Sequence, residues 1–336
     1  MKSRFFNSLA ITLLFLAACT AAVGSPTGAG TLPIKATAVP LNPADPAQDQ
    51  VGRLLYRGGF RLTSPDKRFG GLSGLHVSAN GERMIAMSDN GRWVSAKLLY
   101  DKDNLAGVTD GVLKPIKKLK GYHRHGNWTD AESLAQDGSG GFYVSFEHLH
   151  RIWHYPAHPT DPIDADPEPL NGPAGFESQP LNGGVEALTR LCDRRLLAIS
   201  EEAPGTEPGT KKAWFYDGQS WKALNYRTTG KFRVSGVTTL PDCNLAILER
   251  SYTRREGPRV RVLYLPAATI RAGVTLQGEE LATLARPLTV DNMEGIAARR
   301  DHGKTLLYLI SDDNFSRRQR TLLMMFELLP PPEKKK

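Results

Sequence analysis

Most of the chain is a succession of short apolar runs separated by polar turns. The runs alternate between apolar and polar positions and are bounded by Gly, Asp, Asn and Pro. This pattern is typical of β-strands joined by tight turns, and helical periodicity is hard to find. We therefore expect an all-β protein.

One short motif recurs five times within this pattern. Each copy has a residue with a side-chain oxygen, then a small residue, then an aliphatic one: Ser73-Gly74-Leu75, Glu132-Ser133-Leu134, Glu186-Ala187-Leu188, Ser235-Gly236-Val237 and Glu294-Gly295-Ile296. Successive copies begin 59, 54, 49 and 59 residues apart. After each copy, a second apolar run ends in Ser, Asp or Glu. A repeat near this period indicates stacked or radial repetition of one supersecondary unit.

The number of apolar runs in each repeat matches the number of strands in a propeller blade. Most of them contain four apolar runs, and four antiparallel strands make a blade. The fifth repeat lacks its fourth run because the chain ends, and the segment Leu54 to Leu62 can supply it. We therefore predict a β-propeller of five blades, closed by pairing of the N- and C-terminal strands. Six blades are the alternative, if the N-terminal segment forms more of a blade.

The first residues have the features of an export signal. Basic residues in the first four positions precede a short apolar stretch over residues 9–18, which is too short to span a bilayer. The stretch ends in Leu16-Ala17-Ala18-Cys19, which resembles a bacterial lipobox, in which the cysteine is lipidated. An ordinary cleavage site after Ala21 or Ala22 is the alternative.

These features predict four segments. They are a signal peptide (residues 1–18), a lipidated N-terminus with a tether rich in Ala, Gly, Pro and Thr (19–50), a single propeller domain (51–329) and a polar tail (330–336). Lipidation at Cys19 would anchor the protein in the bacterial cell envelope, at the outer membrane or facing the periplasm. No later stretch is apolar for long enough to span a membrane.

Charge narrows the range of partners. The net charge is +8 and the pI is about 9.3, and the basic residues are spread along the chain. The sequence has no nucleic-acid-binding module, so we expect no nucleic acid as a partner. The basic surplus suits an anionic small-molecule substrate or ligand. We expect the protein to be a monomer. Two cysteines other than Cys19, Cys192 and Cys243, occupy corresponding turns of adjacent repeats. In an oxidising compartment they can form a disulfide, and two unpaired thiols are the alternative.

The triplets carry the candidate metal site. In a propeller, the first strand of each blade lines the central channel, so ring closure places five residues at one level: Ser73, Glu132, Glu186, Ser235 and Glu294. Three carboxylates in a narrow channel must be paired, protonated or metal-bound. Because Ca²⁺ takes six to eight oxygen ligands, we predict calcium here rather than Mg²⁺. A ring bonded only to water and backbone is the alternative.

The ends of the second runs carry the candidate catalytic groups. The first two strands of a blade form a hairpin, so these ends lie on the same face as the ring. The acidic candidates are Asp89, Glu147, Glu201, Glu249 and Asp312, and the candidate substrate-binding residues are Asn90, Arg92, Arg250 and Arg317. Arginine holds phosphate oxygens, a metal neutralises charge and a carboxylate orients water, as a phosphate-ester site needs. For any one residue, ordinary charge pairing at the rim is the alternative.

Other motifs in the sequence provide only weaker candidates for a functional site. Two histidine groups are weaker metal-ligand candidates: His123 and His125, and His148, His150, His154 and His158. The sequence has no Gly-x-Ser-x-Gly elbow, no phosphate-binding loop and no dinucleotide fingerprint.

Several motifs, in order, resemble the bacterial family called "esterase-like activity of phytase". They are Phe69-Gly70-Gly71-Leu72-Ser73-Gly74-Leu75, Ser88-Asp89-Asn90-Gly91-Arg92-Trp93, Asp130-Ala131-Glu132-Ser133-Leu134, Gly184-Val185-Glu186-Ala187-Leu188 and Asp291-Asn292-Met293-Glu294-Gly295-Ile296. The resemblance extends over about residues 55 to 327. It implies a β-propeller and, by the family's name, hydrolysis of a phosphate ester or another ester.

The axial ring has a more distant resemblance of its own. The order Ser, Glu, Glu, Ser, Glu is similar to that of the animal calcium-activated nucleotidases (apyrases), which are five-bladed propellers with calcium on the axis. This resemblance implies that the five ring residues are calcium ligands. The apyrases' substrate-binding residues have no clear counterparts here, so nucleotidase activity is not implied.

Two functions are therefore expected as alternatives. The first is a calcium-dependent hydrolase of a phosphate ester or other ester in the cell envelope. The second is a non-catalytic envelope propeller in which calcium is structural and the channel mouth binds a ligand or partner protein.

Overall fold

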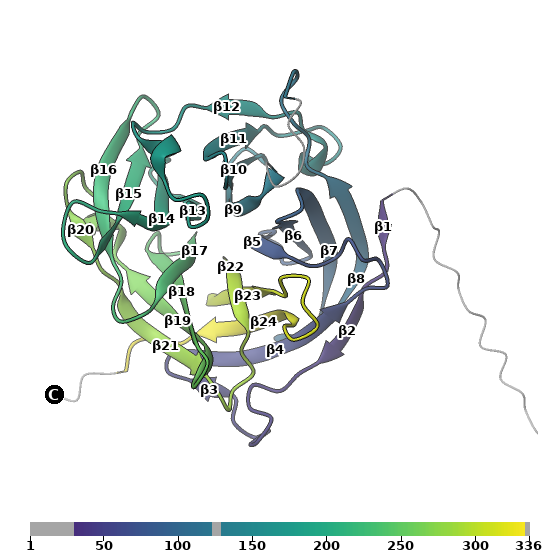
Figure 1. Ribbon diagram of the computed structural model, residues 1–336. Helices are drawn as coiled ribbons and strands as arrows, with labels where there is room; N and C mark the ends of the chain where they lie inside the picture. Colours follow the sequence, from purple (N-terminus) through teal and green to yellow (C-terminus); the bar gives the residue numbers. More distant parts are fainter. Residues whose placement is uncertain (1–29, 123–128, 333–336) are drawn as a thin grey trace, which may run out of the picture.

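The computed structural model describes residues 30–122 and 129–332. Within these residues, five antiparallel sheets form a ring around a common axis (Figure 1). This arrangement confirms the predicted five-bladed propeller. The proposed signal peptide, Cys19, His123, His125 and the last four residues of the polar tail lie outside the described residues. In the described part of the chain, no helix is long and apolar enough to cross a membrane.

Four blades each use consecutive strands of one repeat, from the axis outward. Blade 1 contains β5 (Leu72–Val77), β6 (Arg83–Ser88), β7 (Arg92–Asp101) and β8 (Asn104–Pro115). Blade 2 contains β9 (Ala131–Gln136), β10 (Phe142–Phe146), β11 (Arg151–Tyr155) and β12 (Glu168–Leu170). Blade 3 contains β13 (Val185–Arg190), β14 (Leu196–Pro204), β15 (Thr210–Tyr216) and β16 (Trp221–Arg227). Blade 4 contains β17 (Arg233–Thr239), β18 (Leu245–Thr253), β19 (Gly257–Leu265) and β21 (Glu279–Ala285), while β20 (Thr275–Leu276) pairs with β16.

Blade 5 joins the two ends of the chain. Its inner three strands are β22 (Asn292–Asp301), β23 (Lys304–Asp312) and β24 (Thr321–Leu328). The fourth strand is β4 (Leu54–Thr63), which pairs antiparallel with β24. The closure expected from the incomplete fifth repeat is therefore present.

The segment expected to be a tether is partly built into the propeller. Strand β1 (Thr31–Leu32) pairs with β8 of blade 1, and β2 (Lys35–Ala38) and β3 (Gln50–Val51) pair with β4 of blade 5. Leu32 and Leu41 are each only 1% exposed. The outermost strands of a blade have unpaired backbone groups, and a nearby segment can pair with them even when its composition resembles a linker.

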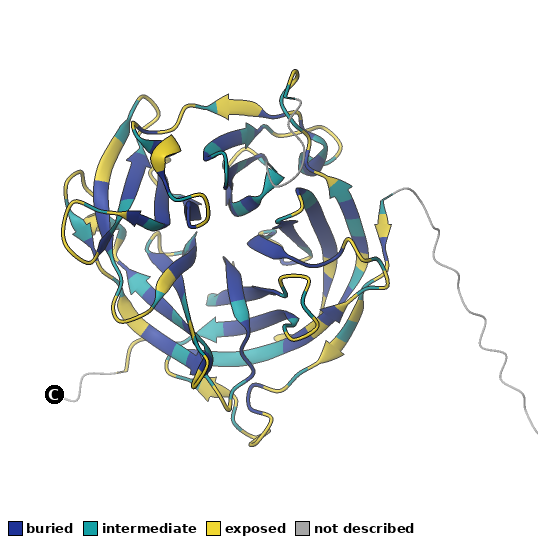
Figure 2. Cartoon of the chain, viewed as in Figure 1, coloured by how far each residue is buried: buried dark blue, intermediate teal, exposed yellow. Residues whose placement is uncertain are grey.

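The core lies between the blades. Apolar side chains from facing sheets form one cluster at each boundary, with fully buried Trp93 between blades 1 and 2 and Tyr308 between blades 1 and 5. Figure 2 shows that the inner strands are mostly buried and that exposed residues lie mainly in the outer strands and loops. The propeller therefore buries the faces of its sheets and presents strand ends and loops to ligands.

A disulfide joins blades 3 and 4. Cys192 lies in the turn between β13 and β14, and Cys243 lies in the turn between β17 and β18; their Cα atoms are 5.6 Å apart. These turns follow the inner strands, so the bridge lies at the end of the propeller away from the triplets. We call the triplet end, where inner strands begin and second strands end, the mouth, and the opposite end the base.

Candidate functional site

A β-bulge interrupts the first hairpin of every blade at its triplet. The pairing between the first two strands shifts by one residue at each of these places. In blades 2 to 5 the extra, unpaired residue is the one that carries the oxygen: Glu132, Glu186, Ser235 and Glu294. A bulge breaks the strict alternation of a strand and re-aims a side chain. The sequence repeat is therefore also a repeat of backbone irregularity.

The first residues of the triplets are largely withdrawn from water. Ser73, Glu186, Ser235 and Glu294 are between 0% and 6% exposed, and Glu132 is partly buried. The small residues that follow allow the inner strands to approach closely. A Cβ atom on Gly295 would lie 2.9 Å from the backbone carbonyl carbon of Gly74, which leaves no room for a side chain.

Most of the acidic candidates at the ends of the second strands lie close to this ring. Repulsion from Glu186, Glu147 and Asp89 acts on Glu132, and repulsion from Glu147, Glu201 and Glu294 acts on Glu186. Asp312 acts in the same way on Asp89 and Glu294. The structure thus brings together carboxylates from four blades, as the hairpin argument predicts.

Glu249 is not brought to the ring. It pairs with Val234 of the inner strand, as Ser200 pairs with Val185 and Ser311 with Met293. Its fully buried carboxylate instead accepts a hydrogen bond from Tyr226 Oη at 2.7 Å and pairs with Arg261.

The next residue, Arg250, therefore occupies the place that an acid holds in the other blades. Its Nη2 lies 3.0 Å from Glu201 Oε1, its Nε lies 3.0 Å from Glu294 Oε2, and its Nη1 donates to Asn292 Oδ1 at 3.3 Å. Burial opposes the charge on the guanidinium, but the attraction of Glu294 and Glu201 outweighs burial and raises the pKa of Arg250. Arg250 is thus a built-in counter-ion on one side of the ring.

Burial nevertheless has the largest effect on the carboxyl groups, including Glu294, which Arg250 contacts. Burial, reinforced by neighbouring acids, raises the pKa of Asp89 and of Glu294 to about 8. The same causes raise the pKa values of Glu132 and Glu186 well above the usual range for a glutamate. Burial first, and then repulsion from Asp313, raises the pKa of Asp312 to about 6. Apart from Asp312, these groups hold protons near neutral pH unless a cation replaces them.

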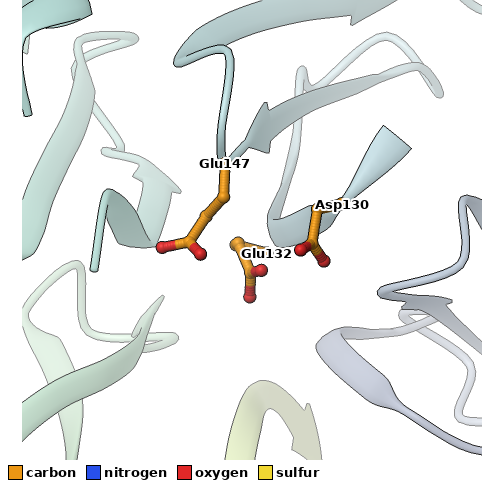
Figure 3. A group of neighbouring side chains, drawn as sticks. All are labelled: Asp130, Glu132 and Glu147. Atoms are coloured by element: carbon orange, nitrogen blue, oxygen red, sulfur yellow. The ribbon is translucent and has the colours of Figure 1, made fainter. Parts of the chain in front are cut away.

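Three carboxylates in blade 2 lie especially close together. Each of Asp130, Glu132 and Glu147 offers an oxygen, and these atoms all lie within 4.8 Å of one another (Figure 3). His148 Nε2 is 3.1 Å from Asp130 Oδ2, and Gly184 donates its N–H to Glu147 at 2.7 Å. Burial raises the pKa of Asp130 to about 6.

This donor set fits a hard cation. Ligand oxygens bind Ca²⁺ at about 2.3–2.6 Å, so two ligands of one ion are separated by at most roughly 5 Å. Within the described residues, the buried Oδ1 atom of Asp130 has no hydrogen-bond partner, which leaves it available as a ligand. Asp130 is absent from the candidates drawn from the sequence. Its position two residues before Glu132 could have identified it, because extended residues two apart share a side of the chain.

The other predicted site residues lie outside this cluster or on its edge. Ser73 Oγ donates to Asp89 Oδ1 at 3.4 Å, and Ser235 Oγ donates to the carbonyl of Met293 at 2.8 Å. Asn90 and Arg317 are exposed, and Arg92 is partly buried at the start of β7. Among the described residues, none of these last three forms a side-chain hydrogen bond or ion pair with the ring.

Among the described residues, the histidines at positions 148, 150, 154 and 158 do not form a separate metal site. His150 Nε2 contacts the carbonyl of Pro180 at 2.8 Å, and His154 Nε2 lies 2.9 Å from Asp137. His158 contacts Thr160. Only His148 reaches the acidic cluster.

A basic cavity of about 810 Å³ adjoins the ring between blades 4 and 5. Arg250 and Asn292 form its inner wall, and it contains five arginines: Arg250, Arg259, Arg286, Arg318 and Arg320. Asp291 is the single acid in the lining, and Arg320 pairs with it at 3.0 Å. Only Arg250 of this set was a site candidate from the sequence, because the others come from loops far apart in the chain. The mouth therefore places a basic surface beside a group of carboxylates.

Comparisons with known proteins agree with this architecture. A family model described as "Phytase-like: Esterase-like activity of phytase" matches residues 67–315. No curated protein sequence matches the chain.

Two solved structures are similar to the chain over most of its length. The major Malassezia sympodialis allergen Mala s 1 has 14% identity and a TM-score of 0.42, with 86% of this chain and 94% of that chain covered. XC5397 from Xanthomonas campestris, described as a gluconolactonase, has 10% identity and a TM-score of 0.42, with 87% and 97% covered. Neither similarity bears on the activity of this chain. The family match, by contrast, covers all five triplets, and the chain belongs to the phytase-like family named for the esterase-like activity of phytase.

Proposed function

We propose that this protein is a calcium-dependent hydrolase of a phosphate ester or another ester, with its site at the mouth. One observation supports this above all others. Eight carboxylates crowd the mouth: Asp89, Asp130, Glu132, Glu147, Glu186, Glu201, Glu294 and Asp312. Arg250, the rim residue Arg233 and His148 are the bases that pair with them. So large an excess of buried acid requires protons or a cation.

The residues that would hold Ca²⁺ are Asp130, Glu132 and Glu147, with Glu186 and Asp89 next to them. The five-residue ring of the sequence prediction is thereby shifted toward blades 1 to 3, because Arg250 already neutralises the side near Glu294. When bound, the ion would neutralise the site and polarise the phosphoryl or carbonyl oxygen of a substrate.

The chain's own residues would supply the remaining functions. Arg250 and the arginines of the adjoining cavity would hold the anionic group of the substrate. Asp312, whose pKa burial raises to about 6, would accept a proton from the attacking water, because a general base works best with a pKa near the working pH. Glu201, fixed by Arg250 at 3.0 Å, would help to keep the guanidinium in place.

The envelope location and the lipid anchor at Cys19 belong to the same proposal and rest on the sequence alone. They predict that a Cys19→Ser variant loses incorporation of labelled fatty acid in bacteria.

The proposal is tested by measuring stability and turnover together. Calcium at about 100 times its Kd should stabilise the protein by roughly 2.7 kcal/mol, and a chelator should remove this gain. A double variant with Glu132→Gln and Asp130→Asn should lose the gain and lose hydrolysis of p-nitrophenyl phosphate and p-nitrophenyl acetate. Glu177→Gln, which changes an exposed acid that is not one of these eight, is the matched control. A wild type that calcium does not stabilise would refute the metal site, and stabilisation without turnover of any ester would leave a structural ion.

A further inference from the structure

Most of the large apolar side chains that are exposed lie on the mouth side of the propeller. Four such side chains stand out among the described residues: Leu99, Leu181, Tyr252 and Phe315. Leu181 precedes inner strand β13, Tyr252 is near the end of β18, and Phe315 follows β23, so three of the four are on the mouth side. Tyr252 is the most exposed, at 69%.

Tyr252 stands between two basic cavities. It lines the 810 Å³ cavity of blades 4 and 5, where Pro258, Pro287 and Leu288 supply further apolar surface. It also lines a cavity of about 430 Å³ toward blade 3, together with Lys231 and Phe232. Arg250 and Ser251 are shared by both linings. An aromatic ring exposed in such a place can stack against a flat apolar group of a ligand.

Two arginines of the larger cavity are available to an anion. Arg320 is engaged by Asp291 at 3.0 Å, and Arg259 lies 3.6 Å from Glu256. Arg286 and Arg318 are exposed, and within the described part of the chain their side chains form no hydrogen bond or ion pair. A guanidinium without a protein partner can bind a phosphate oxygen without first breaking an ion pair.

We propose that the cavity beside Tyr252 binds a phosphoric or phosphonic acid group that carries an apolar body. The anionic group would lie against Arg286 and Arg318, and the apolar body would lie on the ring of Tyr252 and the neighbouring prolines. A ligand of this size fits, because pockets of roughly 300–1,000 Å³ hold drug-sized molecules. A fully polar polyanion would leave this apolar wall unused. The substrate class of the proposed hydrolase is then an aryl or alkyl phosphate monoester, and this last step alone rests on the proposed function.

The test uses two ligands that differ only in the apolar body and cannot be hydrolysed. Calorimetry with phenylphosphonate and methylphosphonate, in calcium, should show about tenfold tighter binding of phenylphosphonate, a difference of ~1.4 kcal/mol. Tyr252→Ala should abolish this ratio and Tyr252→Phe should retain it. Replacing Arg286 and Arg318 together with Gln should weaken both ligands about equally. Leu99→Ala, at an exposed apolar position outside the mouth, should change nothing.

Clear results would overturn the inference. It fails if neither phosphonate binds, if both bind equally to the wild type, or if Tyr252→Ala leaves the ratio unchanged. Because the phosphonates are not turned over, a protein that keeps the ratio but hydrolyses no ester would refute the proposed function and leave this binding site in place.

Discussion

Arg250 determines which side of the mouth keeps uncompensated negative charge. Among the described residues, it is the basic side chain that pairs with a carboxylate of the inner ring, and it also holds Glu201. An arginine in place of a fifth companion acid removes one negative charge and adds a positive one. The uncompensated charge therefore lies on the opposite side, around Asp130 and Glu132.

Glu249, one residue earlier, has a different role that can be tested directly. Glu249→Gln removes the charge that Arg261 pairs with inside blade 4, where the carboxylate is fully buried. We expect a loss of about 3 kcal/mol in the free energy of unfolding, because breaking a buried ion pair leaves one charge uncompensated. Stabilisation by calcium should persist. Urea denaturation with and without calcium measures both quantities.

The opposite pattern for this variant, unchanged stability with loss of the calcium effect, would show that Glu249 serves the metal site after all. Glu177→Gln, at an exposed position, provides the baseline.

At the residue scale the sequence reveals much of this site but not its exact membership. The repeat identifies the five ring residues and four of the five companion acids that reach the mouth. The repeat also groups Glu249 with those acids, because every apolar run that ends in an acidic residue looks the same in the sequence. Only the pairing of Glu249 with Val234 shows that blade 4 is offset by one residue. Arg286 carries no local signal, since its place in the basic cavity depends on how separate loops meet.

At the scale of elements, the N-terminal segment crosses the boundary at which the ring closes. Strand β1 pairs with the outer strand of blade 1, and β2 pairs with β4 of blade 5. Thr289 in the loop before β22 donates its N–H to the carbonyl of Leu41, and Pro43 lines the basic cavity. The segment thus connects neighbouring blades and forms part of the wall of the basic cavity.

Removal of this segment should destabilise the propeller. A chain that begins at Val51 loses the burial of Leu32 and Leu41, which are each 1% exposed. Full burial of a leucine contributes roughly 1.5–3 kcal/mol, so we expect a loss of about 3–6 kcal/mol relative to a chain that begins at Gly30. The outer edges of β4 and β8 also become unpaired, which should promote aggregation. Urea midpoints and light scattering compare the two chains, and equal midpoints would contradict the expectation.

Closure by β4 could be predicted because the fifth repeat is visibly short of one run. The added strands could not, because Thr31–Leu32 and Lys35–Ala38 are too short to show a pattern of alternation. Their pairing depends on edges that other parts of the chain create.

On the scale of the whole molecule, acid is concentrated on the axis while the protein carries a net charge of +8. In metal-free protein, burial raises the pKa of Asp89 and Glu294 to about 8, and that of Asp130 and Asp312 to about 6. Carboxyl groups of an unfolded chain have pKa values of about 4. Between about pH 4 and about pH 8, the folded protein therefore binds more protons than the unfolded chain does.

The free energy of unfolding of the metal-free protein should accordingly fall as the pH rises from about 4 to about 8. The stabilisation that these carboxyl groups contribute is complete below their pKa in the unfolded chain. It is lost as the pH rises past their pKa values in the folded protein. Saturating calcium should reduce this slope, because it replaces the protons. Urea denaturation in chelator at about pH 5.5 and pH 8 measures the effect. Greater stability at the higher pH would mean that these acids are ionised and well solvated.

The Cys192–Cys243 bridge gives the boundary between blades 3 and 4 one fixed end and one free end. At the base, the two inner hairpins are covalently joined; at the mouth, Glu201 of blade 3 and Arg250 of blade 4 are held together only by charge. Any separation of these blades is thus a hinge motion about the bridge, with its largest displacement at the mouth. The 430 Å³ cavity beside Tyr252 lies along this opening edge. A ligand seated there would act as a wedge at the end of this boundary that no disulfide holds.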